Sequence, residues 1–89
     1  MSEYIEQGFL EYVLKNLLDD PTKLVITRTV DDLGVLLEVQ VSESDMGKLI
    51  GKGGQTAKAL RILLRLIGAK KNERINLKIL EPPKSEEVI

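Results

Sequence analysis

Cysteine and histidine are both absent from this 89-residue chain, and the two absences restrict its chemistry. Without cysteine, neither a disulfide framework nor a thiolate metal site can form, and nothing in the composition points to an oxidising compartment. Without either residue type, the commonest general base and the thiol nucleophile of enzymes are missing. We therefore expect a protein that is not an enzyme and that needs no metal or cofactor. The acidic pairs Asp19-Asp20 and Asp31-Asp32 fall at predicted turns and are expected to form them.

Long apolar segments are also lacking, since no stretch approaches the roughly eighteen residues that a membrane-spanning helix requires. Residues 1–6 are acidic and lack the basic region and apolar run of a signal peptide. We expect neither a membrane span nor a signal peptide, and the predicted localisation is cytoplasmic. The apolar share of 43% is enough for one small core, which predicts a single domain.

The charges of the chain sum to only −1, but they are separated along it. Residues 46–80 carry nine basic residues and one acidic residue, whereas the rest of the chain carries four basic and thirteen acidic residues. A chain polarised in this way can present one cationic surface to an anionic partner while staying near neutral overall. The asymmetry alone leaves open the alternative that these charges are solvated on every side.

The first half of the chain predicts a helix followed by a hairpin. Apolar residues at helical spacing predict a helix over residues 3–18, with Phe9 and Tyr12 in the core, which ends near Asp19-Asp20-Pro21. The predicted buried stripe consists of Ile5, Phe9, Tyr12, Val13 and Leu17. Residues 23–30 and 34–41 are rich in β-branched residues and predict two strands joined by a tight turn.

The second half predicts two helices and a third strand. Residues 45–50 predict a short helix capped by Ser42 or Ser44, and residues 55–67 predict a longer one that Gly68 ends in a left-handed conformation. Alternating residues at 74–80 predict the last strand. The order α-β-β-α-α-β makes an α+β fold, a three-stranded mixed sheet with helices packed on one face. Residues 1–80 are the predicted domain, and residues 81–89 a flexible C-terminal tail.

A glycine-rich loop, Gly51-Lys52-Gly53-Gly54, separates the two predicted helices. Free amides at the start of a helix attract anions, and glycine lets a phosphate approach the main chain closely. Lys52 at the tip and Lys48 one turn earlier can contact phosphate oxygens. The spacing excludes both the Walker A loop and the dinucleotide-binding fingerprint. A plain glycine turn without a ligand remains open, because such a tetrapeptide is common.

The segment MGKLIGKGGQTAKALR, residues 46–61, resembles the KH domain. More narrowly, residues 4–80 resemble the small bacterial KH-only proteins of the KhpA (YlqC-like) family. The resemblance implies a type II KH fold and the binding of single-stranded RNA, in which the G-x-x-G loop clamps about four nucleotides. It places the sugar-phosphate backbone on the glycine loop, which Leu49 and Ile50 support. Ala57 departs from the family pattern, which often has a larger aliphatic residue there, and predicts a shallower groove floor.

The long predicted helix carries a basic edge, because Lys58, Arg61 and Arg65 fall within about 60° of one another around its axis. This edge is expected to extend the contact with RNA. The predicted RNA-binding residues are Gly51, Lys52, Gly53, Gly54, Lys48, Ile50, Lys58, Arg61 and Arg65.

The apolar arc of the same helix spans about 220°, which is more than packing on one sheet face requires. The side expected to pack on the sheet comprises Ala57, Leu60, Leu63, Leu64 and Ile67. Ala59, Ile62 and Leu66 lie beyond it and need another cover, either the N-terminal helix or a second subunit. The family resemblance implies self-association into a homodimer and a heteromer with a larger KH-containing protein of the Jag or EloR type. These three residues are therefore the predicted dimer interface.

The three aromatic residues all lie in the first predicted helix, so base stacking on aromatic rings is not expected. The leading hypothesis is an RNA chaperone or adaptor that binds single-stranded RNA with little sequence preference. An alternative is a KH-fold interaction scaffold with little RNA affinity. A preference for single-stranded DNA also stays open, because no residue identifies a contact to a 2′-hydroxyl.

Overall fold

The structure, a computed structural model, describes residues 4–81. In chain order its helices and strands are α1 (Ile5–Leu17), β1 (Val25–Asp31), β2 (Gly34–Gln40), α2 (Met46–Ile50), α3 (Gln55–Lys70) and β3 (Ile75–Ile79). Single turns of 3-10 helix lie at Pro21–Lys23, Glu43–Asp45 and Lys52–Gly54. The predicted order of the elements is confirmed. Most of the predicted tail, residues 82–89, lies outside the described residues.

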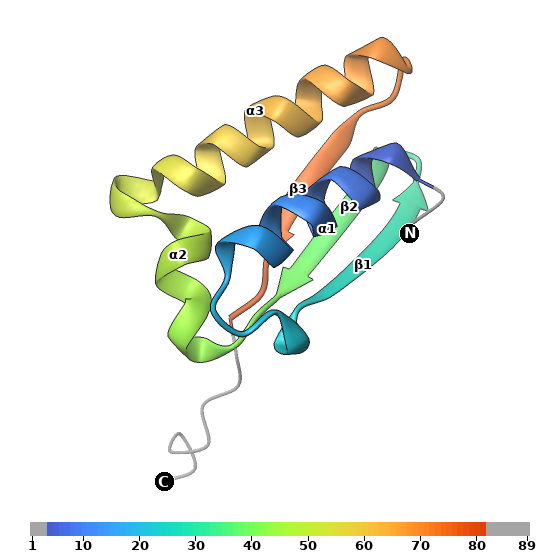
Figure 1. Cartoon of the computed structure of the whole chain (residues 1–89). Coiled ribbons are helices and arrows are strands. Elements are labelled where there is room, and N and C mark those ends of the chain that lie inside the picture. Colours follow the sequence, from blue (N-terminus) through green and yellow to red (C-terminus); the bar gives the residue numbers. More distant parts are fainter. Residues whose placement is uncertain (1–3, 82–89) are drawn as a thin grey trace, which may run out of the picture.

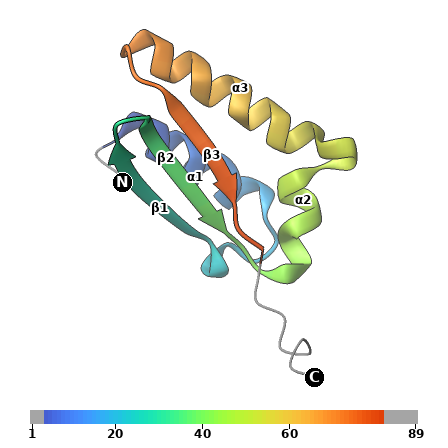
Figure 2. The same cartoon turned by 180° about the vertical axis from the view of Figure 1, so that it is seen from behind.

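The three strands form one mixed sheet in the order β1-β2-β3. β1 pairs antiparallel with β2, and β2 pairs parallel with β3 so that Val35 lies opposite Ile75. The parallel pair follows from the crossover through α2 and α3, which returns the chain to the starting end of the sheet. α1 and α3 lie over the same face of the sheet (Figure 1), and the strands are nearest the viewer when the molecule is seen from behind (Figure 2). β3 is therefore an edge strand.

The core lies between this sheet and the helices. Alternate residues of β2 point toward the helices, because successive side chains of a strand face opposite sides. Each such aliphatic side chain contributes about 1.5–3 kcal/mol when fully buried. The buried cluster consists of Leu10, Leu14, Leu18, Val35, Leu37, Val39, Val41, Leu49, Leu60, Leu64, Ile75 and Leu77.

The buried face of α1 differs from the predicted stripe. Tyr12 is 72% exposed and Ile5 is 66% exposed, whereas Phe9 packs partly buried against the core. The residues that are buried are Glu6, Leu10, Leu14 and Leu18. They recur every four positions and so lie on one face of the helix. Because Glu6 is charged, the apolar pattern of the sequence indicated the adjacent face instead. The prediction of a core position was thus right for Phe9 and wrong for Tyr12.

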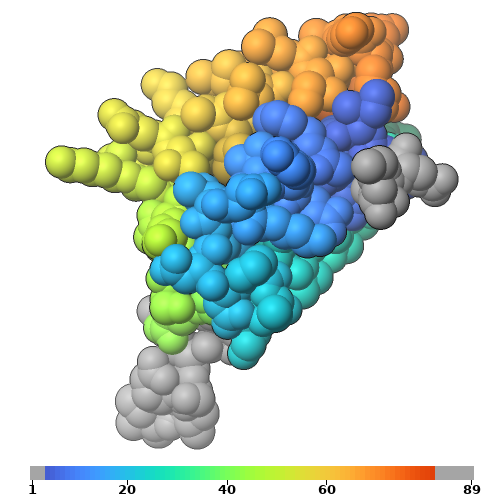
Figure 3. All heavy atoms as spheres, viewed as in Figure 1, coloured from blue at the N-terminus to red at the C-terminus, as the bar shows by residue number. Residues whose placement is uncertain are grey.

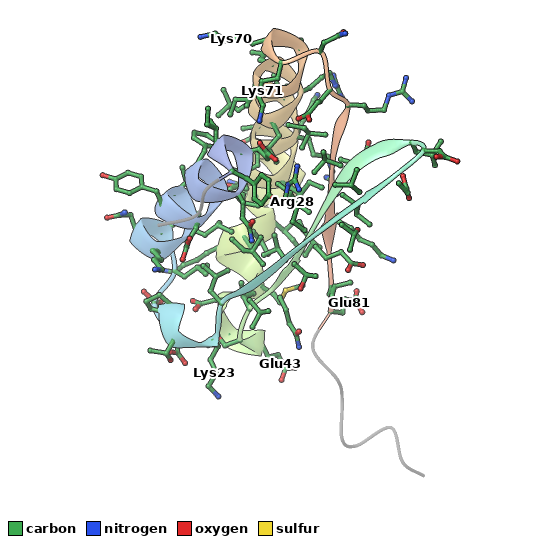
Figure 4. The ribbon with its side chains drawn as sticks, turned by 90° about the vertical axis from the view of Figure 1, so that its right-hand side faces the viewer. Lys23, Arg28, Glu43, Lys70, Lys71 and Glu81 are labelled. Atoms are coloured by element: carbon green, nitrogen blue, oxygen red, sulfur yellow. The ribbon has the colours of Figure 1, made fainter. Side chains whose placement is uncertain are left out.

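The side chain of Glu6 is fully buried and forms ion pairs that connect α1 to β1 and to the end of α3. Its carboxylate accepts a hydrogen bond from Arg28 Nε of β1 at 2.8 Å and one from Lys71 Nζ, just after α3, at 3.1 Å. Arg28 also stacks 3.7 Å from the ring centroid of Tyr4. Figure 4 shows Lys71 and Arg28 pointing toward the same interior region from two elements. This cluster fastens α1 between β1 and the C-terminal end of α3.

The predicted serine cap of the short helix is wrong. The Ser42 hydroxyl donates to the Asp45 carboxylate at 3.2 Å and makes no capping bond to the backbone. Ser44 Oγ lies 3.2 Å from Ser42 Oγ instead of bonding to an amide. Donation to the charged Asp45 carboxylate orients the Ser42 hydroxyl, because hydrogen bonds to charged acceptors are strong.

Gly68 is not the left-handed cap that the sequence predicted. It lies inside α3, which continues to Lys70, and the residue with positive φ is Asn72 at 60°. A Cβ on Gly68 would meet the backbone carbonyl of Glu73 and lie 3.0 Å from Ile75 Cγ1. The glycine therefore serves close packing, because it lets the chain turn back directly from α3 into β3.

Candidate nucleic-acid interface

The turn Gly51–Gly54, called the glycine turn below, connects α2 to α3. Gly51, Gly53 and Gly54 have φ values of 82°, 63° and 77°, a region that glycine enters readily and other residues rarely do. These positive φ values reverse the chain within four residues, so that α3 begins immediately at Gln55. In the space-filling view the junction of α2 and α3 forms a projection from the body of the molecule (Figure 3).

Two of the four amides in the glycine turn have acceptors within the chain. Gly51 N donates to Gly47 O at 2.8 Å, and Gly54 N donates to Gly51 O at 3.0 Å. Among the described residues, no acceptor faces the amides of Lys52 and Gly53, and both residues are exposed. Lys52 and Gly53 are therefore the donors that an incoming phosphate can use.

The glycines of this turn have different roles. A Cβ on Gly51 would meet the side-chain oxygen of Thr56 and lie 2.6 Å from the Thr56 backbone nitrogen. A Cβ on Gly53 or Gly54 would meet nothing within 4 Å. Gly51 is thus required for the turn to fold back onto α3, whereas the space around Gly53 and Gly54 is open to a ligand.

Beside the glycine turn lies an open hollow of about 260 Å³, called the turn hollow below. Its lining comes from α2, the glycine turn, α3 and the end of β3, and comprises Met46, Ile50, Gly54, Ala57, Arg61, Ile79 and Glu81. Most of these side chains are aliphatic, so the hollow offers apolar surface next to the free amides. The small side chain of Ala57 is buried, which keeps this part of the floor low.

The predicted basic edge is exposed along α3. Lys58, Arg61 and Arg65 are all exposed, and within the described part of the chain none of them forms an ion pair. Arg61 also lines the turn hollow. The structure therefore brings Arg61 beside the glycine turn, with Lys58 and Arg65 on the same helix.

Lys48 lies apart from this group. Its Nζ forms an ion pair with the Asp19 carboxylate at 3.0 Å, on the side of α2 that faces the loop after α1. Both side chains are exposed, and such surface pairs contribute about 0–1 kcal/mol, so Lys48 can exchange Asp19 for another anion. Ile50, in contrast, lines the turn hollow, and Leu49 is fully buried beneath it.

The start of α2 is held by Asp45, whose side chain is fully buried. Its two carboxylate oxygens accept the backbone amides of Asp19 at 3.1 Å and Asp20 at 2.9 Å. The hydrogen bond from the Asp20 amide lowers the pKa of Asp45 most, and those from Asp19 and Ser42 and the charge of Lys48 add to it, against the opposing effect of burial. Asp45 therefore stays ionised at neutral pH and fixes α2, and with it the glycine turn, to the end of α1.

A second exposed surface lies on the outer side of α3 and is formed by Ala59, Ile62 and Leu66, called the α3 strip below. Ile62 is 42% exposed and Leu66 is 62% exposed. α1 therefore does not cover the strip. Within the described chain, this excludes the N-terminal helix as its cover, which was one of the two alternatives that the sequence left open. Leu63, predicted to pack on the sheet, is also 44% exposed, so the uncovered apolar surface is wider than predicted.

The sequence did not predict the residues of β3 and of the start of α2 that line the turn hollow. Ile79, Glu81 and Met46 were not among the predicted site residues, yet all three line it. Ile79 alternates with other aliphatic residues and carried only the signal of a buried strand position. The pairing of β2 with β3 brings Ile79 and Glu81 beside α2, and no local pattern indicates that placement.

The architecture and the glycine turn define the class of protein. Along the chain, α2 and α3, joined by the glycine turn, connect the two parallel strands β2 and β3. Helix α1 and strand β1, which is antiparallel to β2, come before them. This is the arrangement of a type II KH domain. No helix in residues 4–81 is long and apolar enough to cross a membrane. The same residues contain no cluster of acidic side chains that could hold a metal ion.

Comparison with known proteins gives the family. The family model described as "KhpA/KhpB, KH domain" matches residues 7–79, and the chain belongs to this family. The protein named RNA-binding protein KhpA of Chlamydia pneumoniae is 40% identical over 73 residues, covering 82% of this chain and 94% of the relative. RNA-binding protein KhpA of Borreliella burgdorferi is 38% identical over 82 residues, covering 91% and 100%. RNA-binding protein KhpA of Listeria monocytogenes is 41% identical over 69 residues, covering 78% and 91%. No solved structure matches the chain.

Proposed function

We propose that this protein binds single-stranded RNA in the cytoplasm as a non-catalytic RNA chaperone or adaptor. The sugar-phosphate backbone contacts the glycine turn, and bases rest on the aliphatic surface of the turn hollow. The observation that carries the proposal is that the exposed amides of Lys52 and Gly53 lack acceptors in the described chain beside that hollow. The family relatives, which are named RNA-binding proteins, support it.

The positions of the charged side chains indicate the path that the RNA follows across this interface. Lys52 is exposed on the turn itself and Arg61 lines the adjoining hollow from α3, so two positive charges lie near the free amides. Glu81 also lines the turn hollow, and its negative charge favours a path for the RNA that stays close to α3. Bases can lie on Ile50 and Ile79 while the phosphates remain on the basic side. Aliphatic surface discriminates bases weakly, so we expect little sequence preference.

Binding is expected to weaken steeply with salt. Each phosphate of a single strand that a protein neutralises contributes about −0.7 to the slope of log affinity against log salt concentration. Three or four contacts, from Lys52, Lys58, Arg61 and Arg65, predict a slope of about −2 to −3. The measurement is fluorescence anisotropy with labelled mixed-sequence single-stranded RNA at several potassium chloride concentrations.

The same titration separates the alternatives. A KH-fold scaffold with little RNA affinity predicts weak binding without a salt slope, and this result would reject RNA binding as the main function. A DNA oligonucleotide of the same sequence is the matched ligand, because it keeps the phosphates and removes the 2′-hydroxyls. Equal affinity for the DNA would show that the interface recognises the backbone and not the sugar.

The α3 strip is the surface for self-association in this proposal. Ile62 and Leu66 extend an apolar surface that the described chain leaves open, on a side of α3 different from the one that lines the turn hollow. A second copy packed there forms a homodimer. A larger KH-containing protein of the Jag or EloR type is the heteromeric partner proposed for the same strip, and competition between the two follows from that shared surface.

Replacement of Ile62 by aspartate is expected to convert the dimer to a monomer. The carboxylate would lose its hydration at a close twofold contact and would face its own copy, which opposes association. The measurement is the mass by light scattering, with circular dichroism as the test of folding. Leu33→Asp is the matched control, because Leu33 is 70% exposed and lies in the β1–β2 turn, which is not part of the α3 strip. A wild-type monomer, or a dimer that survives Ile62→Asp, would rule out this interface.

A further inference from the structure

A second hollow lies between α3 and β3 and is lined largely by arginine. Its volume is about 440 Å³, and its lining comprises Arg61, Arg65, Arg74, Ile75, Asn76 and Leu77. We call it the arginine hollow. Arg61 and Arg65 come from α3, and Arg74 stands immediately before β3. No acidic side chain lines it.

Of the four arginines of the chain, only Arg28 forms an ion pair among residues 4–81. Arg28 and Lys71 bind the buried Glu6, Lys48 pairs with Asp19, and Lys15 pairs with Glu11. No such partner is found for Arg61, Arg65 or Arg74 in the described chain. Three like charges around one hollow repel one another, and an anionic ligand is the means of relieving that repulsion.

The arginine hollow continues the turn hollow. Arg61 lines both of them, so a strand that leaves the glycine turn along α3 reaches the second from the first. At a rise of 1.5 Å per residue, Arg65 stands about 15 Å along the helix from Gln55, where α3 begins. β3 is an edge strand, so within residues 4–81 no further strand lies on the side of β3 away from β2 (Figure 2).

The chemistry of the lining fits a phosphodiester backbone. A guanidinium group presents a planar fork of donors that matches two phosphate oxygens, and Asn76 adds an amide that can donate or accept. The path ends at Arg74, which also lines a neighbouring hollow beside Asp31 and Asp32 of the hairpin turn. Their carboxylates repel phosphate, so the strand is not expected to continue past Arg74.

We propose that the arginine hollow is a second phosphate-binding subsite, which takes the RNA backbone beyond the nucleotides held at the glycine turn. It sets the length of RNA that the protein binds well. This inference rests on the proposed RNA-binding function and adds Arg74 and Asn76 to the interface. Affinity then rises with oligonucleotide length until the strand reaches Arg74, and the added affinity depends on Arg65 and Arg74.

The test compares labelled oligouridine of four, six, eight and twelve nucleotides with the wild type and with the variant Arg65→Gln/Arg74→Gln. The wild type is expected to bind the twelve-nucleotide RNA at least about tenfold more tightly than the four-nucleotide RNA, because charge-assisted contacts are added. The variant should lose most of that gain, so that it binds the twelve-nucleotide RNA little more tightly than the four-nucleotide RNA. Its salt slope for the longest RNA should be less steep by about 1.4, which corresponds to two phosphate contacts.

The control variant Lys15→Gln/Lys23→Gln removes the same charge from α1 and the loop after it, and it should keep the full dependence on length. Equal loss in both variants would show a general effect of net charge and would overturn the subsite. A wild-type affinity that does not change with length would also overturn it, while binding of the short RNA would leave the proposed function intact. Failure of the wild type to bind any of the RNAs would refute the proposed function itself.

Discussion

The double variant Lys52→Asp/Gly53→Asp is expected to lower RNA affinity by about a hundredfold or more. It places two carboxylates beside the two amides that lack acceptors in the described chain, where the phosphate should bind, and it removes the lysine charge. Folding should survive, because Lys52 is exposed and a Cβ at Gly53 meets nothing within 4 Å. The left-handed φ of 63° at Gly53 costs a non-glycine residue about 1 kcal/mol, and aspartate is among the residues that tolerate it best.

The matched control is Lys52→Gln/Gly53→Asn, in which asparagine keeps the shape of aspartate and the strain in the turn but adds no charge. It should lose only the contact of Lys52, which amounts to about a tenfold reduction at low salt. Anisotropy titration measures the affinity of both variants, and thermal unfolding checks their folding. Wild-type affinity in the aspartate variant would refute the role of the glycine turn. Equal losses in the two variants would mean that the lost lysine or the backbone strain, and not the added carboxylates, decides binding.

The variant Glu6→Gln is expected to lower the free energy of unfolding by about 3 kcal/mol. Glu6 is fully buried and neutralises Arg28 and Lys71, whose side chains are 14% and 33% exposed. Loss of one partner from a buried ion pair costs about 3–5 kcal/mol, and the partial exposure of the two cations places this site at the lower end. Urea denaturation measures the effect. RNA affinity should stay unchanged, because the lining of the turn hollow does not include Glu6.

The same variant should also change how stability depends on pH. Burial by itself raises the pKa of Glu6, but hydrogen bonds from its own amide, Arg28 and Lys71 and the charge of Lys71 outweigh it, so the pKa lies below its ordinary value of 4.5. The unfolded state therefore binds the proton more readily than the folded state does. The stabilisation is fully present above about pH 4.5 and is lost as the pH falls through the lower, folded-state pKa. Glu6→Gln should lose stability less steeply below pH 4.5 than the wild type, with the remaining slope due in part to Asp45, whose pKa is also lowered.

Glu11→Gln is the control for this prediction, because it removes a carboxylate from the same helix. Glu11 forms an exposed pair with Lys15 at 3.0 Å, four residues apart, and such pairs contribute about 0.3–0.5 kcal/mol. The two variants should therefore differ severalfold in their effect on the free energy of unfolding. If Glu6→Gln costs no more than Glu11→Gln, the buried cluster does not stabilise the position of α1.

The sequence by itself predicted the order of the elements, the mixed sheet and the place of the glycine turn. These features depend on neighbours in the chain, since alternation, helical spacing and turn residues are local signals. The limits of β2 and the start of α3 agree closely with the prediction for the same reason. Family membership was also predictable, because the segment around residues 46–61 carries its motif without a gap.

Only the tertiary structure decided which faces the elements bury and which side chains meet. Glu6 and Lys71 are 65 residues apart, and their pairing determines which side of α1 faces inward, so the apolar pattern around Tyr12 misled. The turn hollow needs Ile79 from the last strand, and the arginine hollow needs Arg74, because parallel pairing of β2 and β3 sets both beside α3. Local pattern fixes the elements, whereas contacts between distant residues depend on how the elements pack.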